Sequence, residues 1–270
     1  MVIREGAVRR GNRDYRRKPV RSGKSRRKGR FRKSSIIANA LLAVVAFFLL
    51  NGVYQVIRKP GEILAPISAS MAKSPELTWQ TYGPFFEKES TAIMTPDLLA
   101  ALAQTESDGN PIARTYWRWR WSWNPLELYR PASSAVGMFQ ITDGTFAQAR
   151  NYCIRDHQVV TEGSWYDPTS CWFNRFYFRT LPSHAIEMTS AYLHRGVVET
   201  LANRSAKTTL AQKQKLAAVI HLCGLRRGEI FAAHGFRTAP AEQCGTHSLR
   251  RYLIKVDRMQ KTFARLRKAS

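Results

Sequence analysis

The chain has 270 residues, which is enough for one or two domains of ordinary size, and 44% of the residues are hydrophobic. That share is typical of a globular chain and excludes a wholly disordered or fibrous protein. The formal net charge is +24, and it is concentrated at the N-terminus, where residues 1–33 hold 15 Lys and Arg against Glu5 and Asp14.

The basic segment 1–33 cannot bury enough apolar surface to offset the entropy of ordering it, so we expect a disordered tail in the cytoplasm. Clustered cations also bind nucleic-acid phosphates, and a nucleic-acid arm is the second reading. However, only Tyr15 and Phe31 could stack on bases. We therefore favour a topology signal that is also attracted to anionic lipid, and we do not expect nucleic acid as a partner.

Residues 34–57 contain no charged side chain. As a helix this segment would be about 36 Å long, enough to cross a hydrocarbon core of about 30 Å. The basic flank precedes it, so the positive-inside rule places the N-terminus in the cytoplasm and the following domain in the periplasm. A signal peptide cleaved at the small residues 68–70 and a twin-arginine signal at 25–27 are the alternatives. We favour an uncleaved, single-pass anchor in the inner membrane.

Residues 58–90 are expected to form a linker, because proline and glycine recur along them and break regular elements. The aromatic side chains at its end predict that this end packs on the next domain; they are Trp79, Tyr82, Phe85 and Phe86. A compact domain is expected over 91–270.

Four cysteines lie in the part predicted to be exported. In an oxidising compartment an even number predicts two disulfides, and of the three possible pairings we favour Cys153–Cys171 with Cys223–Cys244, each closing a short loop. A zinc site is the alternative, because a histidine follows each of two cysteines closely. The chain has no Cys-x-x-Cys pair, so we expect no metal, and we expect no cofactor.

A helix is predicted to begin at 95–97, where a capping Thr, a Pro and an Asp follow one another, and to stop at the Gly-Asn-Pro of 109–111. Leu98, Leu102 and Glu106 are spaced four apart, so Glu106 falls on the apolar face in the last turn. Burial and the partial negative charge of the helix C-terminus both disfavour the carboxylate anion. A carboxylic acid that stays protonated suits general-acid attack on a glycosidic oxygen; a surface glutamate is the alternative.

A second segment, Ala-Val-Gly-Met-Phe-Gln-Ile at 135–141, follows Glu106-Ser107 and Asn110-Pro111 in order. With these motifs the chain resembles the lysozyme-like lytic transglycosylases (SLT domain, glycoside hydrolase family 23 type), which cut peptidoglycan. Their signature is a helix ending in Glu-Ser, an Asn-Pro-type turn, and then Ser-x-x-Ala-x-Gly-Leu-Met-Gln-Ile. The resemblance covers roughly residues 91–263.

The resemblance implies a mainly α, lysozyme-like domain with a small β-hairpin, and it implies peptidoglycan glycan strands as the substrate. It makes Glu106 the catalytic residue. Where the family has Ala-x-Tyr-Asn-x-Gly, residues 217–224 lack the Asn, and His221 or Leu222 stands nearby. The implied substrate-binding residues are Ser107, Gly137, Met138, Gln140, His221 and Tyr252. A core aromatic is the other reading of Tyr252.

The mechanism that the resemblance implies needs one acid. Glu106 protonates the oxygen between N-acetylmuramic acid and N-acetylglucosamine, and then deprotonates the C6 hydroxyl as it closes a 1,6-anhydro ring. A hydrolase would need a second carboxylate, and none of Asp97, Asp108 and Asp143 is compelling. A goose-type lysozyme and a non-catalytic glycan-binding subunit of an envelope-spanning complex remain alternatives. The one-span architecture is typical of local wall opening for a conjugation or type IV secretion apparatus.

Between the two motifs, four Trp alternate with Arg and Ser over 117–123. This period of two would place all the indoles on one face of a strand. We interpret the segment as a wall of the glycan cleft, with Trp119 and Trp121 stacking on sugars and the arginines pairing with stem-peptide carboxylates. A strand packed on the domain core and a membrane-interface patch are the alternatives.

Overall fold

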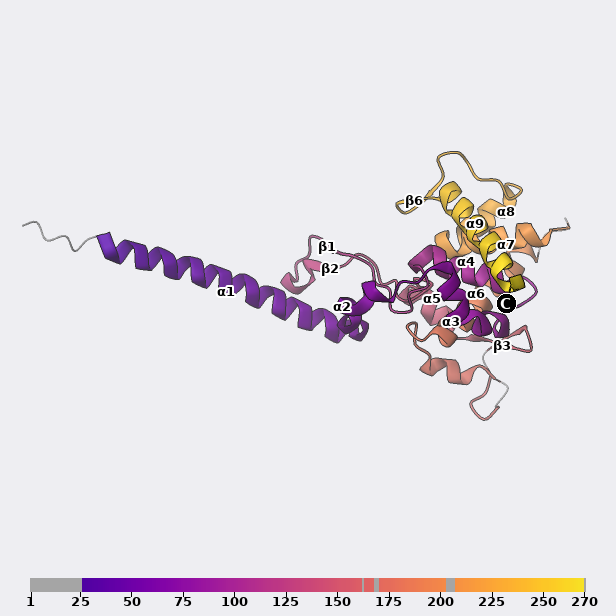
Figure 1. The fold of residues 1–270 in the computed structure, drawn as a ribbon, viewed down its shortest axis with the longest axis horizontal. Helices are drawn as coiled ribbons and strands as arrows, with labels where there is room; N and C mark the ends of the chain where they lie inside the picture. Colours follow the sequence, from indigo (N-terminus) through magenta and orange to yellow (C-terminus); the bar gives the residue numbers. More distant parts are fainter. Residues whose placement is uncertain (1–25, 162, 168–169, 203–206, 270) are drawn as a thin grey trace, which may run out of the picture. The chain divides into compact units, whose positions relative to one another are not determined.

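The structure is a computed structural model that describes residues 26–161, 163–167, 170–202 and 207–269 (Figure 1). Most of the predicted basic tail lies outside these residues. The chain divides into two compact units, residues 1–50 and 51–270. The first described element is the helix α1 (Arg26–Arg58), in which Ser35–Arg58 is long and apolar enough to cross a membrane, with a mean hydropathy of 2.3. One such helix near the N-terminus fits a membrane anchor or a signal sequence.

The expectation that residues 58–90 lack regular structure is wrong. Two 3₁₀ turns, η1 (Pro60–Leu64) and η2 (Ala69–Met71), flank the short helix α2 (Ala65–Ser68), and the helix α3 (Pro75–Lys88) follows.

Helix α3 forms although a proline lies within it. The Ser74 side chain accepts a hydrogen bond from the Leu77 amide, and Pro75 occupies the first turn, where a missing N–H costs nothing. An interior proline such as Pro84 costs about 3 kcal/mol. Burial of large apolar side chains contributes about 1.5–3 kcal/mol each and outweighs that cost. The three concerned are Trp79, Tyr82 and Phe86.

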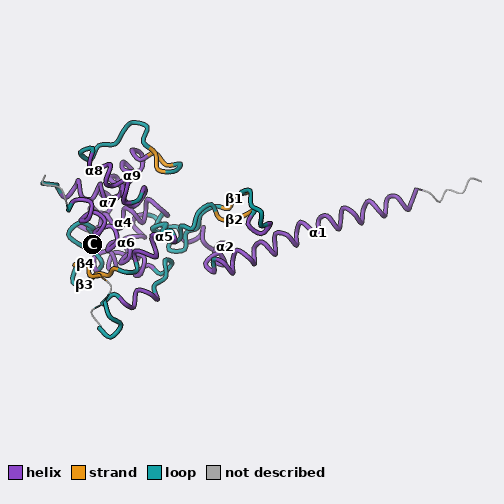
Figure 2. Tube along the Cα trace, turned by 180° about the vertical axis from the view of Figure 1, so that it is seen from behind, coloured by secondary structure: helices purple, strands orange, loops and turns teal. Residues whose placement is uncertain are grey.

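The core of the second unit is helical, as the sequence predicts. It is built around α4 (Pro96–Ser107), whose residues from Leu98 to Ala103 are buried. Helices α3 and α9 pack against α4, and α6, α7 and α8 pack against one another. Figure 2 shows α4 and α6 to α9 gathered in one body. The bounds of these helices are Pro182–Leu201 for α6, Leu210–Cys223 for α7, Leu225–Ala233 for α8 and Leu249–Ala269 for α9.

Strands occur only as short antiparallel pairs among the described residues. They are β1 (Trp117–Trp119) with β2 (Tyr129–Pro131), β3 (Tyr152–Arg155) with β4 (Gln158–Thr161), and β5 (Gln243–Cys244) with β6 (His247–Ser248). The sequence predicts one small hairpin, and the structure has three. The remaining short elements are η3 (Pro125–Glu127), α5 (Asp143–Ala149) and η4 (Trp172–Phe176).

Two disulfides connect the periphery to the core, in the pairing that the sequence analysis favours. Cys153–Cys171 spans 18 residues, and Cys223–Cys244 spans 21. Loops of this length correspond to about 3 kcal/mol of stabilisation each in the chain-entropy account. Cys223–Cys244 also joins the end of α7 to β5.

Candidate active site

Glu106 lies in the last turn of α4, where the four-residue spacing places it, and 16% of its side chain is exposed. The helix ends because Asp108 adopts the left-handed conformation, with φ 52°. Gly109 follows with φ 66°, and a Cβ there would lie 2.3 Å from the Thr78 hydroxyl oxygen. The turn therefore requires glycine, and it holds the end of α4 against α3.

Two side chains from distant parts of the sequence meet at Glu106. The Tyr252 hydroxyl, in the first turn of α9, donates a hydrogen bond of 2.6 Å to Glu106 Oε1. His221 Nε2, in the last turn of α7, lies 3.5 Å from the same oxygen. Among the described residues, none forms a hydrogen bond or ion pair with Glu106 Oε2. One carboxylate oxygen is thus held by the protein, and the other is open to a ligand.

Both neighbours of Glu106 are neutral at neutral pH. Burial, followed by the Glu106 charge and hydrogen bond, raises the pKa of Tyr252 well above its usual value. Burial lowers the pKa of His221, although Glu106 and a hydrogen bond with the Phe139 backbone oppose this. Tyr252 is therefore a phenol donor and His221 an uncharged imidazole, so neither forms an ion pair with Glu106.

A lysine that the sequence analysis missed caps the end of α4. Lys255 Nζ donates a hydrogen bond of 2.8 Å to the Thr105 carbonyl oxygen, next to Glu106 in sequence. A cation at a helix C-terminus interacts favourably with the unpaired carbonyls there. Its spacing of three from Tyr252 on α9 is the signal that could have found it, because such residues share a helix face.

The segment 135–141 packs against the end of α4. The Ser107 hydroxyl donates to the Met138 carbonyl oxygen at 2.9 Å, so the two motifs are joined directly. Gly137 has φ 81°, and a Cβ there would lie 2.2 Å from the Arg179 carbonyl oxygen. Glycine is thus required at 137 for two reasons, the close approach of the Arg179 backbone and the positive φ. Met138 is fully buried, so it packs in the core and joins the two motifs rather than facing a substrate as the sequence analysis expects.

Gln140 stabilises its own turn. It has φ 49°, and its side-chain amide donates to the Gly137 carbonyl oxygen at 3.0 Å. Beside it, the Phe139 ring meets the His221 ring edge-on, with centroids 6.4 Å apart. The structure therefore brings the Gly-Met-Phe-Gln segment to His221 and to Ser107, the residue after Glu106.

The structure does not bring Trp119 or Trp121 to Glu106. Strand β1 covers only three residues. Trp119, its last residue, is 61% exposed, and Trp121, beyond the strand, is 83% exposed. Packing on the domain core, one of the alternatives, is therefore wrong for these indoles. The hairpin is instead bound within the second unit by the last residues of α1, because Asn51 and Gln55 both donate to the Leu126 carbonyl oxygen, at 2.7 and 2.9 Å.

The candidate second carboxylates are engaged elsewhere. Asp97 lies nine residues before Glu106 on the same helix, about 13 Å along its axis, and is 3.2 Å from Arg267. Asp143 pairs with Arg179 at 2.8 Å. Asp108 forms the exposed cap of α4. A zinc site at the cysteines is also excluded while their sulfur atoms are bonded in disulfides.

Comparison with protein families agrees with this geometry. The model of the transglycosylase SLT domain matches residues 83–211, which contain Glu106 and the segment 135–141 but end before His221 and Tyr252. The search of curated proteins and the search of solved structures found no match. The matched region begins within α3, so that helix belongs with the domain. Residues 83–211 are therefore a transglycosylase SLT domain of the lysozyme-like lytic transglycosylase type, and such a domain implies peptidoglycan as the substrate.

Proposed function

We propose that the chain cleaves the β-1,4 bond between N-acetylmuramic acid and N-acetylglucosamine without water. Glu106 gives a proton to the bridging oxygen, and the N-acetyl group assists as that bond breaks. Glu106 then takes the proton of the C6 hydroxyl while the C6 oxygen bonds to C1. The product carries a 1,6-anhydro end, and the glutamate returns to its protonated state.

The observation that carries this proposal is the two-sided environment of Glu106. Tyr252 holds Oε1, and Oε2 is left for the bridging oxygen and then the C6 hydroxyl. Because the sugar hydroxyl returns the proton, the reaction needs no second carboxylate beside the substrate. The location of Asp97 at the far end of α4 supports this reading over a goose-type lysozyme.

The test is digestion of purified peptidoglycan by the full chain in detergent, followed by mass spectrometry of the fragments. We expect fragments one water lighter than hydrolytic products, and we expect them to be absent with Glu106→Gln. Glu229→Gln is the matched control, because Glu229 is exposed on α8. Full-mass reducing ends would contradict transglycosylation. No cleavage by the correctly disulfide-bonded chain would favour a glycan-binding subunit.

We also propose that the apolar stretch of α1 is an uncleaved anchor that holds the domain in the periplasm. The basic N-terminus and the length of the apolar segment support it. Alkaline extraction should leave the chain in the membrane, and protease added to spheroplasts should digest the domain. Release by alkali, or a fully protected domain, would contradict the proposal.

We further propose that the cleavage opens the wall locally for a conjugation or type IV secretion apparatus. The support is the architecture of one anchor and one catalytic domain. A strain with Glu106→Gln should assemble fewer such machines than the wild type. Normal assembly would count against this role.

A further inference from the structure

A cavity of about 710 Å³ lies beside the β1–β2 hairpin, and Glu106 is not among the residues that line it. Eight cationic side chains line the cavity, against two carboxylates, Glu127 and Asp143. Unit charges of one sign at this density repel one another, and the repulsion grows where water is excluded. Six of the cations are Arg58, Arg114, Arg118, Arg120, Arg130 and Arg179.

The hairpin itself carries part of this unbalanced charge. Arg118 pairs directly with Arg130 across the two strands. Like charges in this position destabilise a hairpin. Glu127 offsets Arg130 at 3.0 Å and also pairs with Arg58. Arg118 and Arg120 form no ion pair with any described residue, so the hairpin retains two cations that no described carboxylate neutralises.

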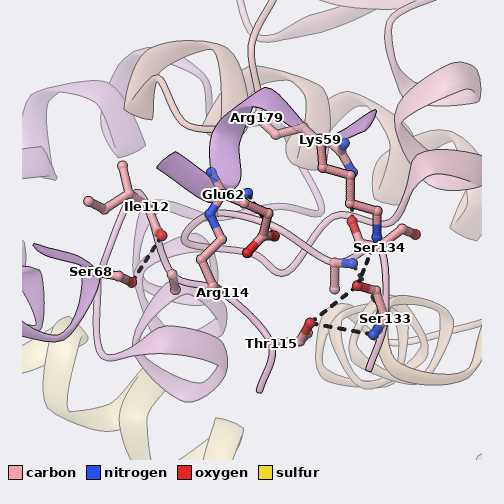
Figure 3. A network of polar contacts seen from close by, with 12 residues as sticks. Lys59, Glu62, Ser68, Ile112, Arg114, Thr115, Ser133, Ser134 and Arg179 are labelled. Atoms are coloured by element: carbon pink, nitrogen blue, oxygen red, sulfur yellow. Dashed lines mark hydrogen bonds and ion pairs between the residues drawn. The ribbon is translucent and has the colours of Figure 1, made fainter. Parts of the chain in front are cut away.

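Arg114 is an independent sign of a missing ligand. Only 7% of its side chain is exposed, and its nearest carboxylate oxygen, from Glu62, is 3.6 Å away. Its Nε and Nη2 atoms are buried without a hydrogen-bond partner. Figure 3 shows Arg114 beside Glu62, with Lys59 and Arg179 reaching the adjacent Ser133–Ser134 segment. A buried guanidinium with unsatisfied donors at a cavity wall favours an anion there.

The position of the cavity indicates where that anion comes from. Gln55, Arg58 and Lys59, at the end of the apolar helix, form part of its wall. On the hairpin, Trp119 and Tyr129 share the face opposite Arg118, with ring centroids 5.0 Å apart.

The aromatic character continues beyond the strand. Trp121 is 83% and Trp123 95% exposed. Tryptophan is enriched at membrane–water interfaces, where an apolar ring with one polar edge fits best. Arginine forms paired hydrogen bonds with phosphate oxygens. The hairpin therefore presents the two chemistries that a lipid surface recognises, with Trp119 and Tyr129 on one face of the strands and Arg118 and Arg130 on the other.

We propose that this cavity binds the headgroup phosphate of an anionic phospholipid, with Trp119, Trp121 and Trp123 in the interfacial layer beside it. The inference rests on the proposed anchoring by residues 35–58, whose end forms part of the site. A glycan backbone consists mostly of neutral rings and does not need a cluster of this charge. The lipid would dock the domain against the membrane in addition to the anchor.

The first test counts lipids on the full chain in an uncharged detergent by native mass spectrometry. We expect short-chain phosphatidylglycerol to bind about tenfold more tightly than phosphatidylcholine. Arg118→Gln with Arg120→Gln should weaken phosphatidylglycerol binding about tenfold, or about 1.4 kcal/mol. The matched control is Arg226→Gln with Arg227→Gln, which removes the same charge from exposed positions on α8 and should bind as the wild type does.

Four results would overturn the inference. They are equal binding of the two lipids, equal loss in both double variants, inorganic phosphate bound as tightly as the lipid, and displacement of the lipid by a disaccharide-peptide fragment of peptidoglycan. The last would assign the cavity to stem-peptide carboxylates. Glu106→Gln should bind lipid normally while losing cleavage, and alkaline extraction reports anchoring alone. Failure of the site, the reaction and the anchor can thus be told apart.

The second test locates the indoles. In nanodiscs, phosphatidylglycerol brominated near the headgroup should quench the tryptophan fluorescence of the full chain. Replacing Trp119, Trp121 and Trp123 together by Phe should remove most of the quenched signal. Trp165→Phe, which also removes an exposed indole, should leave it unchanged. Quenching that persists in the triple variant would contradict the interfacial position.

Discussion

The surroundings of Glu106 and the cationic cavity handle charge in opposite ways. At Glu106 a single carboxylate meets two neutral side chains, Tyr252 and His221, and keeps one oxygen open. In the cavity eight cations surround two carboxylates, and Arg114 is buried with unsatisfied donors. The first arrangement leaves one carboxylate oxygen of Glu106 available to give and take a proton. The second leaves an excess of positive charge, which a bound anion would balance.

The two regions also differ in how they are held. Glu106 sits on a helix buried along most of its length, whereas Arg118 and Arg120 lie in and after a strand of three residues. Substitutions of Glu106 or of the residues around it should therefore lower activity or stability. Substitution of a cation that lines the cavity should relieve repulsion and raise stability. The five predictions below test this contrast, from the largest expected effect to the smallest.

The first prediction concerns the position of the acid. Glu106→Asp withdraws the carboxyl from Tyr252 by one methylene, and we expect cleavage to fall about 100-fold because reacting groups tolerate little misplacement. With Glu106→Gln we expect the rate of cleavage to fall further, to about 1,000-fold below the wild type, because the general acid is lost. Rates of muropeptide release measure both. An aspartate variant as active as the wild type would show that the exact position of the carboxyl group is not critical, and a glutamine variant as active as the wild type would remove Glu106 from the mechanism.

The second prediction concerns Gly137. Gly137→Ala adds a Cβ 2.2 Å from the Arg179 carbonyl oxygen at a positive φ, so we expect a loss of about 3 kcal/mol in the free energy of unfolding. Gly144→Ala is the control, since a Cβ there meets nothing within 4 Å. Denaturant unfolding of both variants measures the difference. Similar stabilities would show that the loop can move aside.

The third prediction isolates the tyrosine hydroxyl. Tyr252→Phe keeps the packed ring but loses the 2.6 Å hydrogen bond to Glu106, so we expect cleavage to fall about tenfold to 30-fold. Tyr166→Phe is the control, because Tyr166 is largely exposed. An unchanged rate with Tyr252→Phe would mean that the bond orients nothing in the reaction.

The fourth prediction is a pH dependence of stability. Burial lowers the pKa of His221, so the unfolded chain takes up a proton before the folded one does. The free energy of unfolding should fall as the pH drops below about 6.5, the ordinary imidazole value. His184 and His194, whose pKa values burial also lowers, contribute in the same direction. His221→Gln should make this fall shallower in unfolding curves, and an equal slope would contradict the assignment.

The fifth prediction, at the hairpin, has the smallest expected effect, and it is a gain in stability rather than a loss. Arg118→Thr removes the like-charge pair with Arg130, so we expect the free energy of unfolding to rise by about 0.5 kcal/mol. Arg118→Lys keeps the charge and should show no gain. A destabilised threonine variant would mean that the arginine is already neutralised in the free protein.

Much of the Glu106 site was predictable because its signals are local. The Thr-Pro-Asp start and the spacing of four place α4 and its glutamate, and the glycine at 137 marks a turn that no other residue fits. Lys255 was missed because its partner is a backbone carbonyl 150 residues away. Such a partner leaves no pattern in the nearby sequence.

Helix α3 was missed for a different reason. Proline and glycine lower the helical propensity of residues 75–88, and only the core that forms around Trp79 and Phe86 compensates. Tertiary packing of this kind cannot be computed from a single segment. The role of the hairpin was equally hidden, because its contacts with Asn51 and Gln55 depend on where the first helix ends.

The small side chains of α4 have a consequence for how this protein can change. Ala100, Ala101 and Ala103 are fully buried, so neighbouring helices approach the α4 backbone closely. A larger residue at any of them would overlap a neighbour and displace the helix that carries Glu106. Variation that preserves the chemistry is therefore confined to segments away from α4. The hairpin at 117–131 is such a segment. Substitutions there can change what the domain binds without changing which bond Glu106 cleaves.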